Sequence, residues 1–433
     1  MTLAEPCYGI SATAIERVSE EQPKYIRITD FDDSGIKENH KFMTAESYTK
    51  KHLLEPADIL FARTGGTVGK TYYYDGSIGK AVFAGYCIRF RFDKNKVLPK
   101  YVYWCTKTDF YNLWVKGTQR PSGQPNINKE EFKSFQIPLL SLEKQKSLVD
   151  FMDAALEQQR AKLEQAEKLI NSITNKIADI IGIKIPDISI ELFNAVKLIS
   201  INNSITKRLD PKCYSKKFAI LRNEITSSVY KKYALKDLIL ENTSGDWGEA
   251  ADSVDNEYVK CLVLRATEIS NRHNIEIKED KAQYRAISKK KLTAMNMEIG
   301  DMIVEKSGGS EDQPVGRVVY LDRLEYNGVP IAYSNFLTKL KVNSELVDPY
   351  YLFEYLRFIY NIGLTEVMQN QTNGIRNLIF SEFLAQTIIV PENHKEIGLA
   401  IKAIRQQARA LELEAEQEWQ QAKEQFEKEL LAK

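Results

Sequence analysis

The stretch DILFARTGGTVGKTYYYD (58–75) joins an apolar run to a glycine-rich segment that ends in Gly69-Lys70-Thr71. A phosphate-binding loop of that spelling would need a glycine at position 64 and a helix after Thr71. The sequence instead has Thr64, followed later by three tyrosines and the turn signal Asp75-Gly76. We therefore predict a strand–loop–strand hairpin and reject an ATPase.

A second copy of this stretch, DMIVEKSGGSEDQPVGRVVYLD (301–322), supports that prediction. Asp301 matches Asp58, Gly308-Gly309 matches Gly65-Gly66, and Val315-Gly316-Arg317 matches Val68-Gly69-Lys70 after an insertion. The copy keeps a basic residue but loses the Lys-Thr pair. A hairpin tolerates that change, whereas a phosphate cradle does not.

The repeat continues in the same order through both halves of the chain. The segments 81–93, 99–112 and 118–138 pair with 330–343, 348–361 and 370–391. The first pair reads as alternating strands, the second as Pro-started helices, and the third as a Gly/Asn-rich loop leading to a short helix and a strand. Self-similarity of this kind predicts two similar α+β domains.

Each repeat ends in a long helical stretch with apolar or small residues spaced by three and four. The stripe of the first stretch (142–181) contains Leu148, Met152, Ala155, Leu163, Ala166, Ile170, Ile173 and Ile177. That of the second (394–431) contains Ile397, Ile401, Ile404, Ala408, Leu411 and Ala415. Such stripes are typical of coiled coils, and forty helical residues would measure about 60 Å.

The predicted fold is therefore α+β, with two similar domains of mixed, mainly antiparallel β structure and short helices. Two long antiparallel coiled-coil helices separate the domains, which a pseudo-twofold axis relates. The predicted limits are 1–140 for the first domain, 141–182 for the first helix, 183–393 for the second domain with an N-terminal preamble, and 394–433 for the second helix.

The composition narrows the class of protein. The 433 residues contain 60 Lys+Arg and 59 Asp+Glu, so any basic surface must be local. The five cysteines are scattered without a C-x-x-C pair, which argues against a metal site and a disulfide framework. The sequence shows neither a signal peptide nor an apolar run of membrane-spanning length, so we expect a cytoplasmic protein.

The loops of both repeats carry residues suited to DNA. Arg and Lys suit guanine edges and phosphates, Asn and Gln suit adenine, and glycines allow backbone amides to approach phosphates. The candidates in the first repeat are Arg63, Thr64, Thr67, Lys70, Tyr72, Arg120, Ser122, Gln124 and Asn126. Those in the second are Lys306, Ser307, Arg317, Tyr333, Asn335, Gln371, Asn373 and Arg376.

In this arrangement the chain resembles the specificity subunit of type I restriction–modification enzymes. The resemblance rests on YIRITDFDDSGI (25–36), DILFARTGGTVGK (58–70), GQPNINKEEFKSFQIPLL (123–140) and RLDPKCYSKKFAIL (208–221). It implies a non-catalytic subunit whose two target recognition domains each read one half of a bipartite, asymmetric site in double-stranded DNA. It also implies that the long helices dock two methyltransferase (modification) subunits, which restriction/translocase subunits then join. S-adenosylmethionine and ATP would be bound by those partners, and no cofactor by this chain.

The sequence offers little for catalysis by the chain itself. An amino-methyltransferase needs Asn/Asp-Pro-Pro-aromatic, but LDPKCY (209–214) and VDPYYL (347–352) have one proline each. Glu276-Ile277-Lys278 has a nuclease-like spelling that arises readily by chance, and the four histidines are far apart. Two further functions stay open for the chain: the specificity region of a single-chain restriction–methyltransferase, and a coiled-coil scaffold that binds only proteins.

The two repeats differ at their beginnings. A preamble with a helical segment, 216–229, precedes the second repeat, whereas only 24 residues precede Tyr25 in the first. We expect either that this start is truncated or that chain from elsewhere, such as residues 183–230 or the C-terminal helix, closes the first domain.

Overall fold

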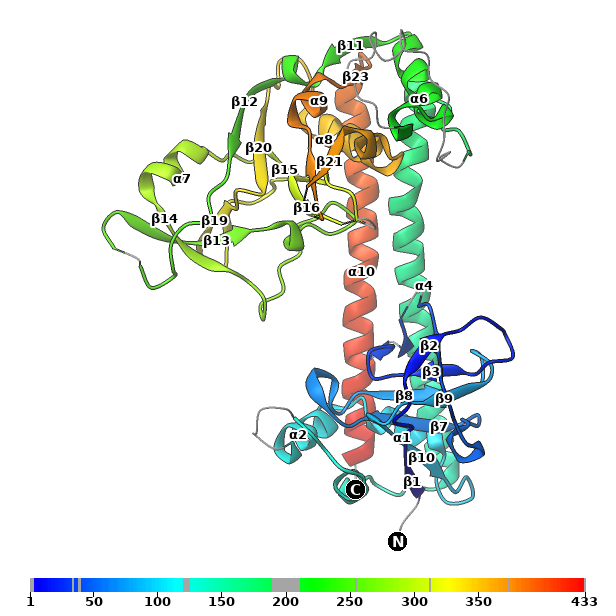
Figure 1. The fold of residues 1–433 in the computed structure, drawn as a ribbon. Coiled ribbons are helices and arrows are strands. Elements are labelled where there is room, and N and C mark those ends of the chain that lie inside the picture. Colours follow the sequence, from blue (N-terminus) through cyan, green and yellow to red (C-terminus); the bar gives the residue numbers. More distant parts are fainter. Residues whose placement is uncertain are drawn as a thin grey trace. The chain divides into compact units, whose positions relative to one another are not determined.

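The structure is a computed structural model of the full chain (Figure 1). It describes residues 4–32, 35–37, 40–119, 125–188, 211–253, 255–310, 313–372 and 374–431. The chain forms two compact units. The first contains residues 1–164 and 411–433, and the second contains residues 165–410. Each long helix therefore contributes one part to each unit.

The first unit is built around a four-stranded antiparallel sheet in the order β1-β10-β7-β8, with smaller pairs β2-β6, β3-β9 and β4-β5. All five residues of the central strand β7 are buried, as expected for a strand covered on both faces. Its strands are β1 (Ala4–Tyr8), β2 (Ala14–Glu16), β3 (Lys24–Ile26), β4 (Phe31–Asp32), β5 (Gly35–Ile36), β6 (Met43–Ala45), β7 (Asp58–Ala62), β8 (Thr71–Tyr74), β9 (Ala81–Phe83) and β10 (Cys87–Phe92). Its helices are α1 (Pro99–Cys105), α2 (Asp109–Thr118), α3 (Lys129–Ser134) and the beginning of α4 (Leu142–Ile181).

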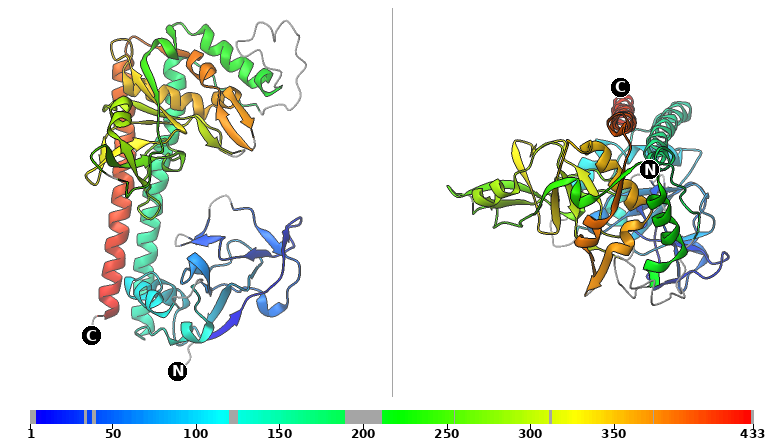
Figure 2. Two further views of the ribbon diagram at one scale, coloured as in Figure 1. Left: turned by 60° about the vertical axis from the view of Figure 1, so that its left-hand side comes forward. Right: turned by 90° about the horizontal axis from the view of Figure 1, so that it is seen from above.

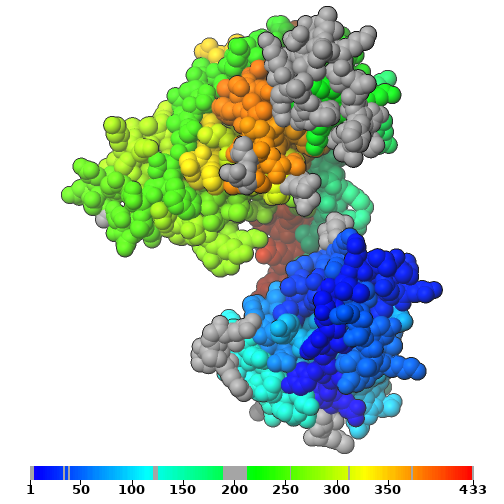
Figure 3. All heavy atoms as spheres, in the orientation of Figure 1, coloured from blue at the N-terminus to red at the C-terminus, as the bar shows by residue number. Residues whose placement is uncertain are grey.

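The second unit contains a matching sheet, β12-β20-β15-β17, together with β14-β13-β19-β18, β16-β22-β21 and β11-β23. The lobe made by β13, β14 and α7 stands out from the rest of the unit in green to yellow-green (Figure 3). The strands are β11 (Lys231–Ala234), β12 (Ile239–Ser244), β13 (Tyr258–Leu264), β14 (Tyr284–Ser288), β15 (Met302–Glu305), β16 (Ser307–Gly309), β17 (Val318–Tyr320), β18 (Glu325–Tyr326), β19 (Val329–Tyr333), β20 (Leu337–Val342), β21 (Gln369–Thr372), β22 (Ile375–Leu378) and β23 (Thr387–Val390). The helices are α6 (Lys216–Ser227), α7 (Lys289–Met295), α8 (Pro349–Asn361), α9 (Phe380–Ala385) and α10 (His394–Leu431), whose C-terminal part belongs to the first unit.

The predicted repeat is present in the four-stranded sheet of each unit. The hairpins β7–β8 and β15–β17 occupy the same place in sheets of the same order, and each unit also contains a parallel strand pair, β3–β9 in the first and β13–β19 in the second. The stretch 58–75 is thus a strand–loop–strand hairpin, as predicted. The structure confirms the α+β class, with mainly antiparallel sheets, short helices and two long helices.

The matching glycines Gly69 and Gly316 are required by the turn and by packing. Their φ angles are +86° and +104°, in the region that favours glycine. A Cβ at Gly69 would lie 2.7 Å from Val115 Cγ1, and one at Gly316 would lie 3.2 Å from Thr365 Cγ2. The absence of a side chain at both glycines therefore lets the hairpin pack closely against a neighbouring helix, α2 in the first unit and the 3₁₀ helix Leu364–Met368 in the second.

Within the first unit, α4 and α10 run antiparallel and side by side (Figure 2). Lys144 pairs with Glu429, and Lys162 pairs with Glu414 at 3.2 Å and with Glu418 at 2.6 Å, so rising numbers on one helix meet falling numbers on the other. Most of the predicted apolar stripe is buried, but the prediction for Leu163 is wrong, because its side chain is 41% exposed. Neither these helices nor any other among the described residues is long and apolar enough to cross a membrane.

The C-terminal helix α10 contributes side chains to the core of the first unit. This was one of the two segments that we expected to close the first domain. Trp419, Ala422, Phe426 and Leu430 pack with Tyr101, Trp104 and their neighbours. The other proposed closure, residues 183–230, falls in the second unit where it is described, and residues 189–210 lie outside the described part.

Candidate nucleic-acid interface

Each unit places one basic residue at the end of its central strand. Arg63 follows β7, and Lys306 follows β15. Their backbones make the same two bonds: Arg63 N–H donates to Tyr86 O and Arg63 O accepts from Ile127, while Lys306 N–H donates to Phe336 O and Lys306 O accepts from Leu378. The two cations therefore occupy equivalent positions.

Each cation contacts the last residue of the edge strand of its sheet, which is Tyr8 of β1 in the first unit and Ser244 of β12 in the second. The Arg63 guanidinium lies over the ring of Tyr8, 5.1 Å from its centre, and Lys129 Nζ also lies 5.7 Å from that ring. In the second unit, Lys306 Nζ donates to Ser244 Oγ at 3.0 Å. Burial lowers the pKa of the Lys306 ammonium, and an approaching phosphate would favour its charged form.

An asparagine and a hydroxyl residue accompany each cation. Thr64 and Asn126 form an isolated backbone β-bridge in the first unit, and the side chain of Ser307 donates through Oγ to Asn377 Oδ1 at 2.6 Å in the second. Arg63 Nε and Asn126 Oδ1 are buried and lack a hydrogen-bond partner among the described residues. Buried polar atoms are nearly always paired, so these two are suited to receive a ligand.

An exposed aromatic residue borders each cation. Tyr86 is 62% exposed and Phe336 is 48% exposed, and their carbonyls accept from Arg63 and Lys306. Sequence reasoning missed Tyr86, Phe336, Lys129 and Asn377. The repeat itself was the available signal for two of them, because Tyr86 directly precedes β10 as Phe336 directly precedes β20.

Several other candidates lie close to these groups. Thr67 ends a 3₁₀ turn that begins at Gly65, and Lys70 accepts through its backbone from Ala62 where the hairpin returns. Arg376 pairs with Gln371 across β21–β22 and with Gly309 of β16, and exposed Asn335 precedes Phe336. The structure therefore gathers Arg63, Thr64, Thr67, Lys70 and Asn126 in one unit, and Lys306, Ser307, Asn335, Gln371 and Arg376 in the other.

Four candidates are buried. Thr64 is 6% exposed, but its backbone bridges to Asn126 beside Arg63, so we keep it in the site. The other three lie in the protein core, and we propose no DNA contact for them. Tyr72 is 6% exposed and packs against Phe31, and Tyr333 is fully buried with its hydroxyl donating to Thr243 O. Arg317 is 3% exposed and donates twice to buried Glu305, at 2.9 Å each. Arg120, Ser122, Gln124 and Asn373 lie outside the described residues.

The first of these sites falls within a segment that matches a known family. Residues 18–175 match the family model described as "Type I restriction modification DNA specificity domain". Residues 18–175 are therefore similar to a type I restriction modification DNA specificity domain. The matched segment includes Arg63, Tyr86 and Asn126, whereas Lys306 lies beyond the matched residues and is related to it through the internal repeat.

Three solved structures align with nearly the whole chain at low identity. One, described as "Structural basis underlying complex assembly and conformational transition of the type I R-M system", shows 12% identity over 99% of this chain and 96% of that chain, with a TM-score of 0.49. The S subunit of a type I restriction-modification system from M. genitalium shows 11% identity over 99% and 93%, with a TM-score of 0.41. The HsdS subunit from Thermoanaerobacter tengcongensis shows 12% identity over 99% and 97%, with a TM-score of 0.35. The comparison with curated proteins gave no match.

The residues of the two sites are of types suited to recognition. Each unit places a cation, an amide and an exposed aromatic ring together, and these suit phosphate, base edges and sugar or base surfaces. Across the described part of the chain, no group of three or more His, Cys, Asp or Glu side chains is placed to hold a metal ion.

Proposed function

We propose that this chain is the DNA sequence-specificity subunit of a type I restriction–modification complex. The observation that carries the proposal is the duplicated site, in which Arg63 and Lys306 make the same backbone bonds beside an exposed aromatic residue and an asparagine. A structural role alone does not require a cation, an amide and an exposed ring at both positions. Arg63 Nε and Asn126 Oδ1 are buried atoms without a hydrogen-bond partner among the described residues, which supports the proposal that this site receives a ligand.

The two units read different half-sites in this proposal. Their equivalent positions hold Arg63 and Lys306, Tyr86 and Phe336, and Thr64 and Ser307, while Asn126 and Asn377 are the same residue. Arginine can bind a guanine edge with two parallel bonds, whereas lysine acts as a point charge. Similar folds with different reading residues fit a bipartite site whose halves differ in sequence.

The chain acts in this proposal without catalysing a reaction. Two methyltransferase subunits dock on the long helices and supply S-adenosylmethionine chemistry, and ATP belongs to the restriction subunits. The resemblance in sequence and the matched specificity domain support these partners. The near-zero net charge and the few basic residues at each site suggest modest phosphate neutralisation by this chain alone.

The proposal predicts weak binding by the isolated chain and sequence-specific binding with a methyltransferase partner. The test measures duplex binding at several salt concentrations with and without that partner, and then maps methylated bases in DNA from cells carrying both. Two half-sites separated by an unread spacer are the expected result. Tight, sequence-selective binding by the isolated chain would contradict the need for the partner, and methylation without sequence preference would overturn the function.

A further inference from the structure

The two units differ in the segment that follows their short helices α3 and α9, and this segment can be aligned between the units by its hydrogen bonds. In each unit a tyrosine hydroxyl marks the same backbone position: Tyr101 donates to Pro138 O at 2.8 Å, and Tyr351 donates to Ile389 O at 2.7 Å. The helices just before these positions, α3 and α9, also close with the same bond, from Phe135 to Phe132 and from Gln386 to Phe383. Residues 136–139 are therefore the counterpart of strand β23.

In the second unit this segment is covered by chain from the preamble. Strand β11 pairs with β23, with Tyr233 opposite Ile388 and Lys231 opposite Val390. Helix α6, which precedes β11, packs on the same strand and buries Phe218, Leu221 and Ile225 at spacings of three and four. As a result Ile388 and Ile389 are fully buried and Val390 is 5% exposed.

In the first unit the counterpart segment has no such cover among the described residues. Gln136 is exposed, Ile137 and Pro138 are half-buried, and Leu139 is 60% exposed. No described residue forms a strand beside it. We call residues 136–139 the open edge.

The open edge retains the hydrogen-bonding pattern that a strand would need. In the second unit Leu235 N–H donates to Gln386 O. Because the direction of hydrogen bonding alternates along an antiparallel pair, the C=O of Gln386 and the backbone N–H and C=O groups of Ile388 and Val390 face β11. The backbone C=O of Ile389 faces the opposite side and accepts from the Tyr351 hydroxyl. The counterpart of Ile389 is Pro138. Proline has no backbone N–H, but at this position an added strand would not need one. The outward positions are Phe135, Ile137 and Leu139, and the described chain makes no hydrogen bond to the backbone of Ile137 or Leu139.

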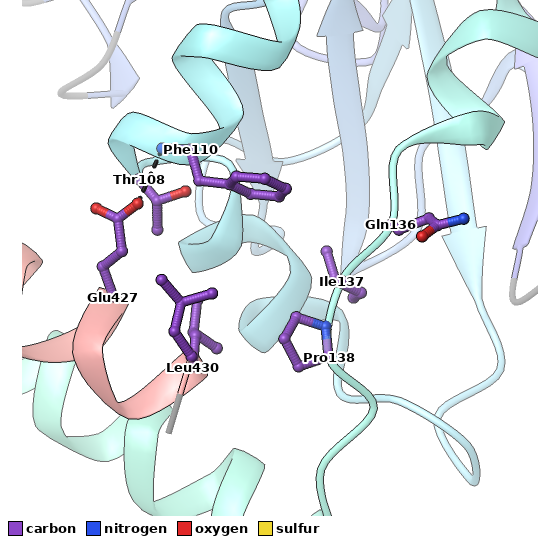
Figure 4. A pocket seen from close by; sticks show the side chains of 8 residues that line it. Thr108, Phe110, Gln136, Ile137, Pro138, Glu427 and Leu430 are labelled. Carbon is purple, nitrogen blue, oxygen red and sulfur yellow. Dashed lines mark hydrogen bonds between the residues drawn. The ribbon is translucent and has the colours of Figure 1, made fainter. Parts of the chain in front are cut away.

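A groove lies beside the open edge (Figure 4). Its volume is about 340 Å³, and its walls include Phe110, Ile137, Pro138, Leu430 and Leu431. Phe110 is 47% exposed and Leu431 is 65% exposed. Large apolar side chains left open beside an unpaired strand edge are typical of an interaction surface.

We propose that the open edge and its groove dock a helix–strand segment of a separate polypeptide. That segment adds an antiparallel strand beside residues 136–139 and lays an apolar helical stripe against the groove, as α6 and β11 do in the second unit. A second copy of this chain is a poor source, because its own α6 is already engaged, with Phe218 and Leu221 fully buried. Main-chain bonds would supply affinity and the apolar stripe specificity.

The test uses the full chain and a synthetic peptide of residues 214–238, which contains α6 and β11. Peptide is titrated to about 100 μM, and amide hydrogen exchange is read at single-residue resolution. We expect one peptide per chain and about tenfold slower exchange at Ile137 and Leu139. A control peptide with Phe218→Asp and Leu221→Asp should not bind.

A pair of chain variants locates the binding. Leu139→Pro removes an outward N–H and should abolish binding, whereas Leu139→Val keeps the N–H and should retain it. Absence of binding or of slower exchange at these amides would overturn the proposal, as would equal binding by the Leu139→Pro variant. If the chain instead dimerises in ultracentrifugation with the same amides protected and no peptide present, the occupant is a second copy and the proposed source is wrong.

Discussion

At the residue scale, Arg63 and Lys306 hold equivalent positions but should act on different bases. Replacing Arg63 by Ala should weaken or relax recognition in one half-site by about 1–3 kcal/mol, the range for a good base contact, and Lys306→Ala should affect the other half-site. Exposed Lys94, in the turn after β10, gives a control: Lys94→Ala should leave both half-sites unchanged. Methylation mapping with the partner present measures this. A change in both half-sites from either single variant would contradict independent reading.

Arg317 was predicted to contact DNA, but its surroundings make it a structural residue. Arg317→Ala leaves the Glu305 carboxylate buried without its partner, which costs about 3–5 kcal/mol of unfolding free energy. Changing both residues, Arg317→Met with Glu305→Leu, should recover most of that loss, since a buried ion pair can be replaced by apolar groups. Urea unfolding measures both variants. A stable Arg317→Ala protein with altered half-site specificity would restore the DNA-contact interpretation.

His273 makes the stability of the second unit depend on pH. Its Nδ1 accepts from Val318 N–H at 3.1 Å, and burial lowers its pKa well below 6.5, with Arg357, Arg405 and Arg317 lowering it further. The unfolded chain takes up a proton near pH 6.5 while the folded chain does not. The stabilisation is therefore complete above pH 6.5 and falls by about 1.4 kcal/mol per pH unit below it, until the folded pKa is reached.

The matched variant for this prediction is His273→Asn. Asparagine accepts the φ of +61° at this position and does not titrate. Urea unfolding at pH 7.5, 6.5 and 5.5 should show a shallower loss of stability for His273→Asn than for the parent chain. Identical slopes would show that another group controls the acid response.

At the scale of the element, the β7–β8 hairpin depends on one glycine more than on its neighbours. Gly69→Ala combines a φ of +86° with a Cβ 2.7 Å from Val115, so it should destabilise the first unit by about 1–3 kcal/mol. Gly66→Ala is the control, because a Cβ there meets no atom within 4 Å. Thermal unfolding compares the two. If Gly66→Ala preserved stability but lost DNA binding, close approach of that backbone to a phosphate would be the better account of Gly66.

At the scale of the whole molecule, the long helices should set the length of the unread spacer. Adding four residues between Leu163 and Ala166 lengthens α4 by about 6 Å and turns it by about 40°. A matching insertion of four residues between Ala410 and Leu411 lengthens α10 by the same amount. The ion pairs of Lys162 with Glu414 and Glu418 show that these parts of the two helices lie opposite each other, so both helices must be lengthened together. One to two added base pairs, at about 3.4 Å each, would match the length, and one would also match the rotation.

Methylation mapping of the paired-insertion variant checks the spacer, and both half-site sequences should stay the same. The control is an insertion of four residues in the β18–β19 turn, after Gly328. That turn belongs to neither long helix, so the insertion leaves the lengths of both helices unchanged. A variant with full activity and an unchanged spacer would show that the helices do not set the distance.

The amino-acid sequence by itself determined the repeat, the hairpins at 58–75 and 301–322, and the two long helices. These features depend on glycine spacing and on apolar periods of two or of three and four, which are local properties of the chain. Only the tertiary structure decided which side chains reach solvent. Lys70 and Arg317 match in sequence, yet Glu305 binds Arg317 in the core where the first unit has Ala62. In the same way the positions of Tyr86, Leu163 and the open edge follow from long-range packing, because burial depends on what distant segments cover.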